Sequence, residues 1–171
     1  MGQPRQILAF LALSLLAEPP EWVPFQGAYE NKVGYAYRVT VPPGFTGFKP
    51  PPPAPQHGFM IDLGSTARLS VDGSYNANDA PSARHAAEAH TEYQKGARPR
   101  YRRTSLAGLP AVETIIHYQQ RERRSIIALR HHPPVGIVYE IVLDAPLPLS
   151  ARALSTFRAL RETFQLTRLS D

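Results

Sequence analysis

One segment of the sequence, residues 136–143, constrains the fold more than any other. It reads Gly-Ile-Val-Tyr-Glu-Ile-Val-Leu. In a strand its side chains would alternate between the two faces of the sheet, and Glu140 is the one charged side chain among them. A strand that is apolar on both faces is covered by further structure on both sides. The chain is therefore expected to place this segment in the centre of a sheet that has another layer on each face.

Shorter strands are expected on both sides of this segment in the sequence. Residues 35–41 are β-branched and aromatic, and a strand there places Tyr35, Tyr37, Val39 and Val41 on one face. Further strands are predicted at 59–63, 67–71, 111–118 and 125–129. The turn residues Gly64-Ser65-Thr66 separate two of them, which predicts a hairpin.

Two helices complete the predicted elements. Asp79 is an expected N-cap, and the first helix is predicted to run from there to about Lys95, before Gly96. Ser150 is expected to cap a second helix over residues 151–164. The positions with helical spacing on this second helix predict a buried stripe of Leu154, Phe157, Leu160 (or Arg161) and Phe164.

These elements indicate one α+β domain over residues 33–168, preceded by an irregular leader at 18–32. The predicted fold class is an antiparallel β-sheet flanked by helices, an α/β/α sandwich. A chain of 171 residues can bury a sufficient core in one domain. It contains no Cys, so disulfides and thiolate chemistry are excluded.

The first 17 residues have the layout of a secretory signal peptide. Arg5 precedes an apolar run at residues 7–16, and the small residue Ala17 follows it. The run is shorter than the roughly 20 residues that span a bilayer. We expect export to the periplasm or the extracellular space, with cleavage near Ala17. A retained membrane anchor and a buried helix are the alternatives.

The order of these parts resembles the PsbP-like superfamily, which includes the PsbP proteins of photosystem II and the Ran-binding Mog-type proteins. The resemblance rests on residues 37–45, 67–71, 106–111 and 138–143 and on the closing helix with Phe157-Arg158-Ala159-Leu160-Arg161-Glu162-Thr163-Phe164. It implies an antiparallel sheet between helices and a small exported bacterial member. It carries over no function and no site residue, because one fold supports unrelated activities.

The densest basic segment is the predicted binding site. The chain has 19 Lys plus Arg against 14 Asp plus Glu, and residues 95–103 contain Arg98, Arg100, Arg102 and Arg103 with Tyr101 between them. Arginines beside an aromatic ring suit an anionic lipid or polysaccharide. Export makes nucleic acid an unexpected partner. The alternative is that these charges are solvated, or that they protect a sheet edge against aggregation.

The sequence carries no recognisable catalytic or metal motif. Six His residues show no ligand spacing, and Glu113 and His117 share a strand face but lie ~13 Å apart along it. There is no Gly-x-Ser-x-Gly sequence. We therefore expect no catalytic residue, metal or cofactor. The predicted function is an exported, non-catalytic binding or scaffold domain whose partner is a protein or envelope component. Binding of an anionic lipid or glycan through residues 95–103 is the alternative, and an unrecognised hydrolase the less favoured one.

Overall fold

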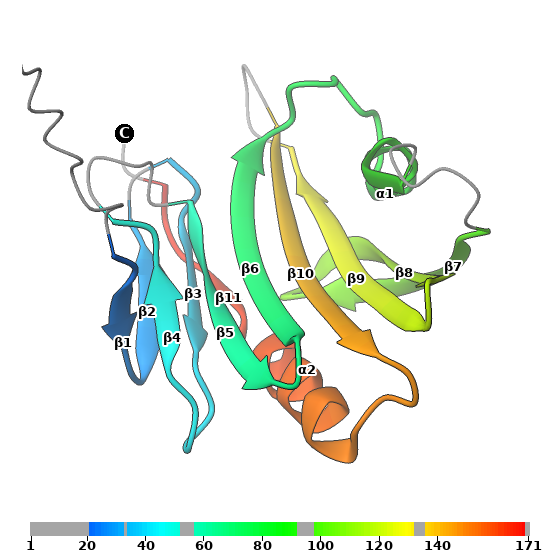
Figure 1. Ribbon diagram of the computed structural model, residues 1–171. Helices are drawn as coiled ribbons and strands as arrows, with labels where there is room; N and C mark the ends of the chain where they lie inside the picture. The colour runs from blue at the N-terminus through cyan, green and yellow to red at the C-terminus, as the bar shows by residue number, and fades with distance from the viewer. Residues whose placement is uncertain (1–20, 33, 52–56, 92–97, 132–135, 170–171) are drawn as a thin grey trace, which may run out of the picture.

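The fold is built on one long antiparallel sheet (Figure 1). The computed structural model describes residues 21–32, 34–51, 57–91, 98–131 and 136–169, so the predicted signal peptide lies outside the described residues. The eight strands follow the order β1 (Val23–Phe25), β4 (Gly47–Lys49), β5 (Gly58–Gly64), β6 (Ala67–Tyr75), β10 (Ile137–Pro146), β9 (Arg121–Arg130), β8 (Leu109–Tyr118) and β7 (Arg100–Leu106). The predicted central segment is β10, which pairs with β6 and β9 and is buried at most positions on both faces.

A second, three-stranded sheet has the order β11 (Gln165–Leu166), β3 (Tyr37–Thr40) and β2 (Ala28–Asn31). The expectation of an irregular leader at residues 18–32 is corrected here, because β1 and β2 both lie in it. These strands have three and four residues, too few to show a hydrophobic period. They form through pairing with strands later in the chain, β1 with β4 and β2 with β3.

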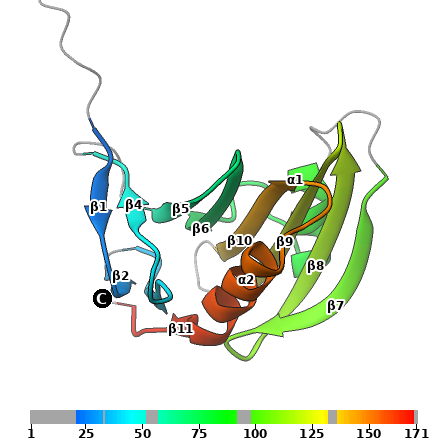
Figure 2. The ribbon, with the colours of Figure 1, turned by 60° about the horizontal axis from the view of Figure 1, so that its bottom comes forward.

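The two helices contact opposite faces of the long sheet. α1 (Ala83–Thr91) packs on β8 and β9, and α2 (Ala151–Thr163) packs on β10 and β3. Successive side chains of β9 point to opposite faces of the sheet and so contribute to both cores. Ile126 belongs to the core beneath α2, whereas Ile127 belongs to the core beneath α1. The α+β class is therefore confirmed. The face that carries α2 is also covered by the three-stranded sheet, so helices alone do not form that layer (Figure 2).

The larger core lies between the two sheets and α2. Phe157, Leu160 and Phe164 are buried as predicted, and Leu154 packs at the margin of this core. The ring of Phe164 stacks on Tyr37 with centroids 5.2 Å apart. Ser150 caps α2 as expected, since its hydroxyl accepts a hydrogen bond from the Ala153 backbone N–H at 3.1 Å.

The smaller core lies beneath α1 and is made of small and aliphatic side chains: Ala80, Ala83, Ala86, Ala87, Val112, Ile127, Leu129 and Val138. The predicted N-cap of α1 was wrong. Asp79 adopts a left-handed backbone conformation, with φ at 47°, and α1 begins at Ala83. Ser82 caps this helix, because its hydroxyl accepts from the His85 N–H at 3.3 Å. The predicted helix end near Lys95 lies outside the described residues.

Candidate functional site

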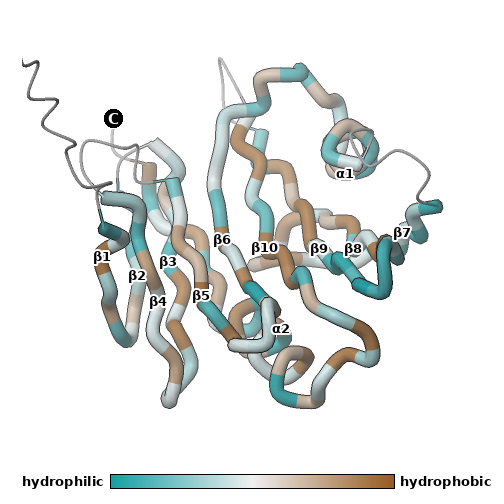
Figure 3. The backbone as a smooth tube through the Cα atoms, in the orientation of Figure 1, coloured by the Kyte–Doolittle hydropathy of each residue, from teal (hydrophilic) through white to brown (hydrophobic). Residues whose placement is uncertain are grey.

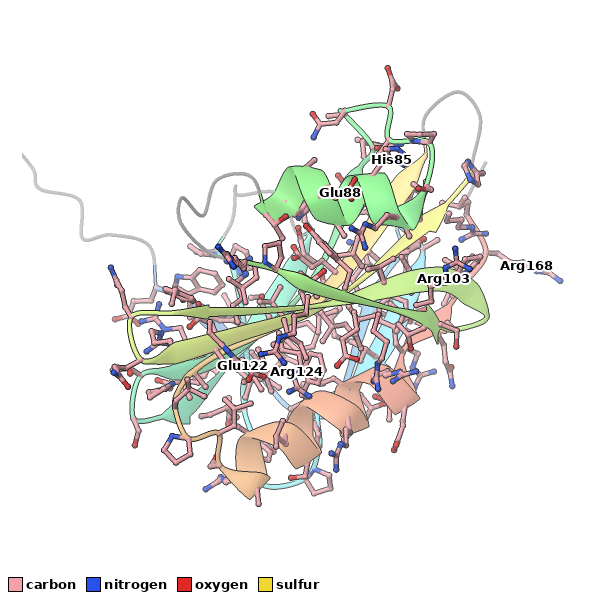
Figure 4. The ribbon with its side chains drawn as sticks, turned by 90° about the vertical axis from the view of Figure 1, so that its right-hand side faces the viewer. His85, Glu88, Arg103, Glu122, Arg124 and Arg168 are labelled. Carbon is pink, nitrogen blue, oxygen red and sulfur yellow. The ribbon has the colours of Figure 1, made fainter. Side chains whose placement is uncertain are left out.

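The predicted basic segment lies at one end of the long sheet, where β7 is the edge strand. Strand alternation divides its residues between two faces. Arg100 and Arg102 lie on the α2 side, and Tyr101 and Arg103 lie on the α1 side. Arg98 is exposed just before the strand. Figure 3 shows β7 as a largely hydrophilic strand, and Figure 4 shows Arg103 on the other side of the sheet from Arg124. The four arginines therefore do not form one surface.

Tyr101 is part of the packing of α1. The guanidinium of Arg84 lies over its ring, 3.6 Å from the centroid. Its hydroxyl forms a 2.8 Å hydrogen bond with the Thr91 hydroxyl in the last turn of α1. Both the ring face and the hydroxyl are thus engaged within the fold. A partner that stacked on the ring face covered by Arg84 would have to displace Arg84.

On the α2 side, charged residues of three strands form a continuous ladder. Glu113 has a side-chain exposure of 6%, and its two oxygens contact Arg102 at 2.5 Å and Arg124 at 3.7 Å. Arg124 also contacts Glu122 at 2.7 Å, and Glu122 lies 2.9 Å from His117 Nε2. Two buried carboxylates are in this way bridged by arginine, as buried charges require.

This ladder was missed in the sequence. Glu113 and His117 were expected on one strand face but too far apart to interact. That expectation considered the strand β8 alone. The neighbouring strand β9 supplies the link, because Glu122 pairs in register with His117. The contact depends on the register of the β8–β9 hairpin, which fixes which residues face each other and which local sequence patterns did not reveal.

A hollow of about 270 Å³ lies beside the ladder, lined by Arg100, Arg102, Glu113, Ile115 and Arg124 together with Tyr101. The register explains the grouping, because Arg100 on β7, Ile115 on β8 and Arg124 on β9 form one row across three strands. Arg102 and Glu113 form the next pair on this face, two residues further along β7 and β8. Arg124 is the member of this group that the predicted basic segment did not include.

A larger cavity, of about 680 Å³, lies at the opposite end of the sheet. Its aromatic lining comes from distant segments: Phe25 on β1, Tyr29 on β2, Tyr35, His57, and Tyr75 at the end of β6. Polar side chains also line the cavity, among them Asn31, Lys32, Glu30 and Lys49. The volume and the mixture of aromatic and polar groups are typical of small-ligand sites.

The aromatic lining is held by hydrogen bonds from neighbouring rings. Tyr37 donates to the His57 carbonyl oxygen at 2.6 Å, and Tyr139 donates to the Tyr35 carbonyl oxygen at 2.6 Å. The Tyr35 ring packs edge-on against His57, with centroids 4.9 Å apart. A side chain at Gly73 would put a Cβ 2.9 Å from Tyr35 Cβ, so the glycine is what allows this close packing.

Burial affects the ionisation of two tyrosines of this cavity. Desolvation raises the pKa of Tyr29 and of Tyr35 above the ordinary tyrosine value. Their hydroxyls are therefore neutral donors and acceptors across the physiological pH range. The charged groups at the cavity are the side chains of Glu30, Lys32 and Lys49, and Lys32 and Glu30 contact each other at 3.7 Å.

Histidines do not gather into a metal site within the described ranges, where no group of three His, Cys, Asp or Glu side chains is close enough to hold an ion. His85 hydrogen-bonds to Ser82, and His90 contacts Glu140 of β10 at 3.3 Å. The hydrogen bond with Glu140 raises the pKa of His90 above the ordinary histidine value. Among the helices of the described residues, none is long and apolar enough to cross a membrane.

Comparison with known proteins shows similarity at the level of fold. No protein-family model matches the chain, and a search of curated proteins finds no similar sequence. The solved structure of LpqN, a protein involved in cell envelope biogenesis of Mycobacterium tuberculosis, matches with a TM-score of 0.54 and 13% identity, over 86% of this chain and 91% of LpqN. A structure from Bacteroides thetaiotaomicron matches with a TM-score of 0.48 and 10% identity, over 84% of this chain and 49% of that one. Neither is named as PsbP-like, so that resemblance remains a prediction.

Proposed function

We propose that this protein is an exported, non-catalytic binding domain of the cell envelope, and that it holds an amphipathic envelope component in the aromatic cavity. The observation that carries the proposal is the cavity itself. Five aromatic rings, three from residues 25–35 and the others from His57 and Tyr75, converge with polar side chains on one hollow of about 680 Å³. Such convergence of distant residues is typical of a binding site rather than of a core.

Two observations support the proposed location in the cell envelope. The first 17 residues have the signal-peptide layout, which predicts export. The fold is shared with LpqN, a protein involved in cell envelope biogenesis. Fold similarity alone does not transfer a role, so the envelope assignment is tested separately. N-terminal sequencing of the protein from its producing cell should find a start near Glu18, and a mature cytosolic form starting at Met1 or Gly2 would contradict it.

The cavity fits a ligand with one apolar face and several polar groups. The side chain of Tyr75 is 54% exposed and its ring lies 5.2 Å from Tyr35, so it offers an accessible aromatic face. Aromatic faces bind apolar surfaces of ligands, and amides and charged groups orient the polar ones. Lys49 lies 5.6 Å from the centroid of the Phe25 ring, beside this aromatic surface. A simple cation is disfavoured, because Lys32 and Lys49 line the same cavity.

The non-catalytic part of the proposal rests on how the ionisable groups are used. The buried carboxylates of Glu113 and Glu122 are each bridged to arginine. Asp144 accepts hydrogen bonds from Arg121 and Tyr118. These groups hold strands together, which is a structural use of charge. Esterase and glycosidase substrates should show no turnover above buffer, and a turnover lost in a point variant would contradict this part.

The binding experiment uses octyl glucoside as an amphipathic probe, below its micelle concentration, with glucose as the purely polar comparison. We expect saturation-transfer NMR signals for octyl glucoside and a weaker response for glucose. Tyr75→Ala should reduce the affinity by about tenfold, the loss expected for one stacked aromatic contact. Trp22→Ala is the matched control, because Trp22 is a 44% exposed aromatic outside the cavity lining. Equal affinity of the wild type and Tyr75→Ala would reject the cavity as the site.

One observation favours the second candidate, binding of an anionic lipid or glycan through residues 95–103. Arg98, Arg100 and Arg103 are exposed along or next to the free edge of the sheet. Their division between two faces argues against one continuous surface.

A further inference from the structure

We propose that the hollow between Arg100, Arg102 and Arg124, on the α2 side of strands β7 to β9, is a binding site for a phosphate group. The juxtaposition that carries this inference is a row of two arginines across three strands, with a third arginine in the next pair on the same face. This site is separate from the aromatic cavity, which lies at the other end of the sheet, and does not depend on the function proposed for that cavity.

The spacing of the arginines suits a phosphate. Arg100 and Arg124 are two strands apart, and adjacent strands are about 4.8 Å apart, so their backbones are separated by about 10 Å. Their long side chains can converge on one group above Ile115, which lies between them. The planar guanidinium binds phosphate through two parallel N–H···O hydrogen bonds.

The local charge balance leaves the hollow positive. The three arginines carry three positive charges, and the two carboxylates of the ladder, Glu113 and Glu122, carry two negative charges. Glu113 is shared by Arg102 and Arg124, and none of the acidic residues in the described part of the chain forms an ion pair with Arg100. An anion entering the hollow would therefore meet Arg100, which has no acidic partner among the described residues, and Arg102 and Arg124, which share Glu113.

The ladder also holds the arginine side chains in place before a ligand binds. Arg124 has a side-chain exposure of 23%, and its contacts with Glu122 and Glu113 fix its guanidinium at the wall of the hollow. Groups that are already positioned lose less conformational entropy when a ligand binds. Arg102 is anchored on the same Glu113 while its side chain remains 73% exposed. The buried acids thus serve as supports for the arginines.

The structure changes which residues of the basic segment belong to the site. Arg103 and Tyr101 lie on the α1 side, and the Tyr101 ring is covered by Arg84. Arg103 is outside the hollow, Tyr101 contributes to its lining, and Arg124, which is distant in the sequence, joins it. The same strand therefore carries a test arginine, Arg100, and a control arginine, Arg103, which are both exposed and differ in the face they occupy.

The test is a titration of the full chain with inorganic phosphate. Binding is monitored through the arginine Nε–H signals in NMR and measured by calorimetry. We expect Arg100→Gln to weaken binding by about tenfold or more, the effect of one charge-assisted hydrogen bond. Arg103→Gln should change the affinity less than twofold. Circular dichroism of both variants verifies the fold. Equal losses in the two variants would show diffuse charge attraction and overturn the proposal, as would no saturable binding by the wild type.

A second arm identifies the source of the phosphate group. Vesicles of phosphatidylglycerol and phosphatidylcholine are compared with vesicles of phosphatidylcholine alone. Retention on the anionic vesicles that Arg100→Gln loses and Arg103→Gln keeps would support a lipid headgroup. Phosphate binding with that same variant pattern but without vesicle retention would support a soluble phosphate ester. Vesicle retention that both variants lose equally, without phosphate binding, would overturn the site.

Discussion

The two ends of the long sheet are built from different chemistry. The end formed by β1, β4 and β5 is aromatic, with Phe25, Tyr29 and Phe59 in mutual ring contact. The end formed by β7, β8 and β9 is charged, with arginine and glutamate alternating across three strands. α2 crosses the sheet between them (Figure 2). One scaffold therefore presents an aromatic cavity and an ionic hollow that do not share lining residues.

This difference determines what each end responds to. Rings are held by burial and packing, which salt hardly affects, and burial keeps Tyr29 and Tyr35 neutral by raising their pKa values. Ion pairs at an accessible edge weaken as salt screens them, over ~10 Å at 0.1 M and ~3 Å at 1 M. Substitutions, salt and pH should thus separate the two ends experimentally.

The largest effect is expected at the aromatic end. Phe59 is 3% exposed and its ring meets Phe25 edge-to-face at 5.2 Å. Phe59→Ala should lower the free energy of unfolding by ~3–5 kcal/mol, because it removes a buried ring and leaves a cavity. Urea unfolding measures the change, and Val23→Ala, at an exposed position of the same end, should stay within about 0.5 kcal/mol. A loss below ~1 kcal/mol for Phe59→Ala would mean that the rings do not hold this end.

The charged end should show a smaller and salt-dependent effect. Glu113→Gln removes the charge shared by Arg102 and Arg124, and should cost ~1–3 kcal/mol at low salt. The difference from wild type should shrink in 1 M NaCl, whereas the Phe59→Ala difference should not. Glu162→Gln, an exposed carboxylate on α2, is the control for a simple change of net charge. A salt-independent loss would contradict the ionic account of this end.

The Thr114 hydroxyl lies at the charged end of the sheet, on the face opposite the ladder. Thr114 is fully buried on β8, and its Oγ1 has no hydrogen-bond partner among the described residues. Thr114→Val keeps the shape and removes the unsatisfied group, so stability should stay equal or rise by up to about 1 kcal/mol. Thermal unfolding checks this. A clear destabilisation would reveal a hydrogen bond that holds this hydroxyl.

The smallest effect concerns the contact of α1 with the sheet. His90 has a raised pKa because of Glu140, with Arg123 and Asp72 also facing it. Its contribution to stability is full below the unfolded-state value of about 6.5 and is lost as pH rises through the higher folded-state pKa. The side chain is 35% exposed, so solvent limits the effect. Urea unfolding of wild type and His90→Gln should differ more at pH 5.5 than at pH 9, and a constant difference would contradict this linkage.

The sequence predicted the elements whose signal is local. β10 was recognised because both of its faces are apolar, and α2 because Ser150 and the stripe through Phe157 and Phe164 follow helical spacing. Residues 35–41 were expected as one strand, yet β3 begins at Tyr37, because Ala36 adopts a left-handed conformation with φ at 49°. Tyr35 is nevertheless buried in the same core as Tyr37, Val39 and Val41.

The sites depend on contacts that local patterns do not contain. The aromatic cavity joins Phe25, His57 and Tyr75, which are separated by many residues and meet only when β1, β5 and β6 take their places in the sheet. The basic segment was correctly noticed as a charge cluster, but strand alternation divided it between faces. Arg124 could join the site only once the β8–β9 register was known.

The central claim, that the two ends of the sheet are separate binding sites, is tested most directly by one pair of NMR titrations on the same labelled protein. Octyl glucoside should shift the backbone signals of Tyr35, His57 and Tyr75, and inorganic phosphate should shift those of Arg100, Ile115 and Arg124. The two sets of shifted residues should not overlap, and saturation with one probe should leave the affinity for the other unchanged. Shifts from both probes at the same residues, or shifts spread evenly over the surface, would contradict the account.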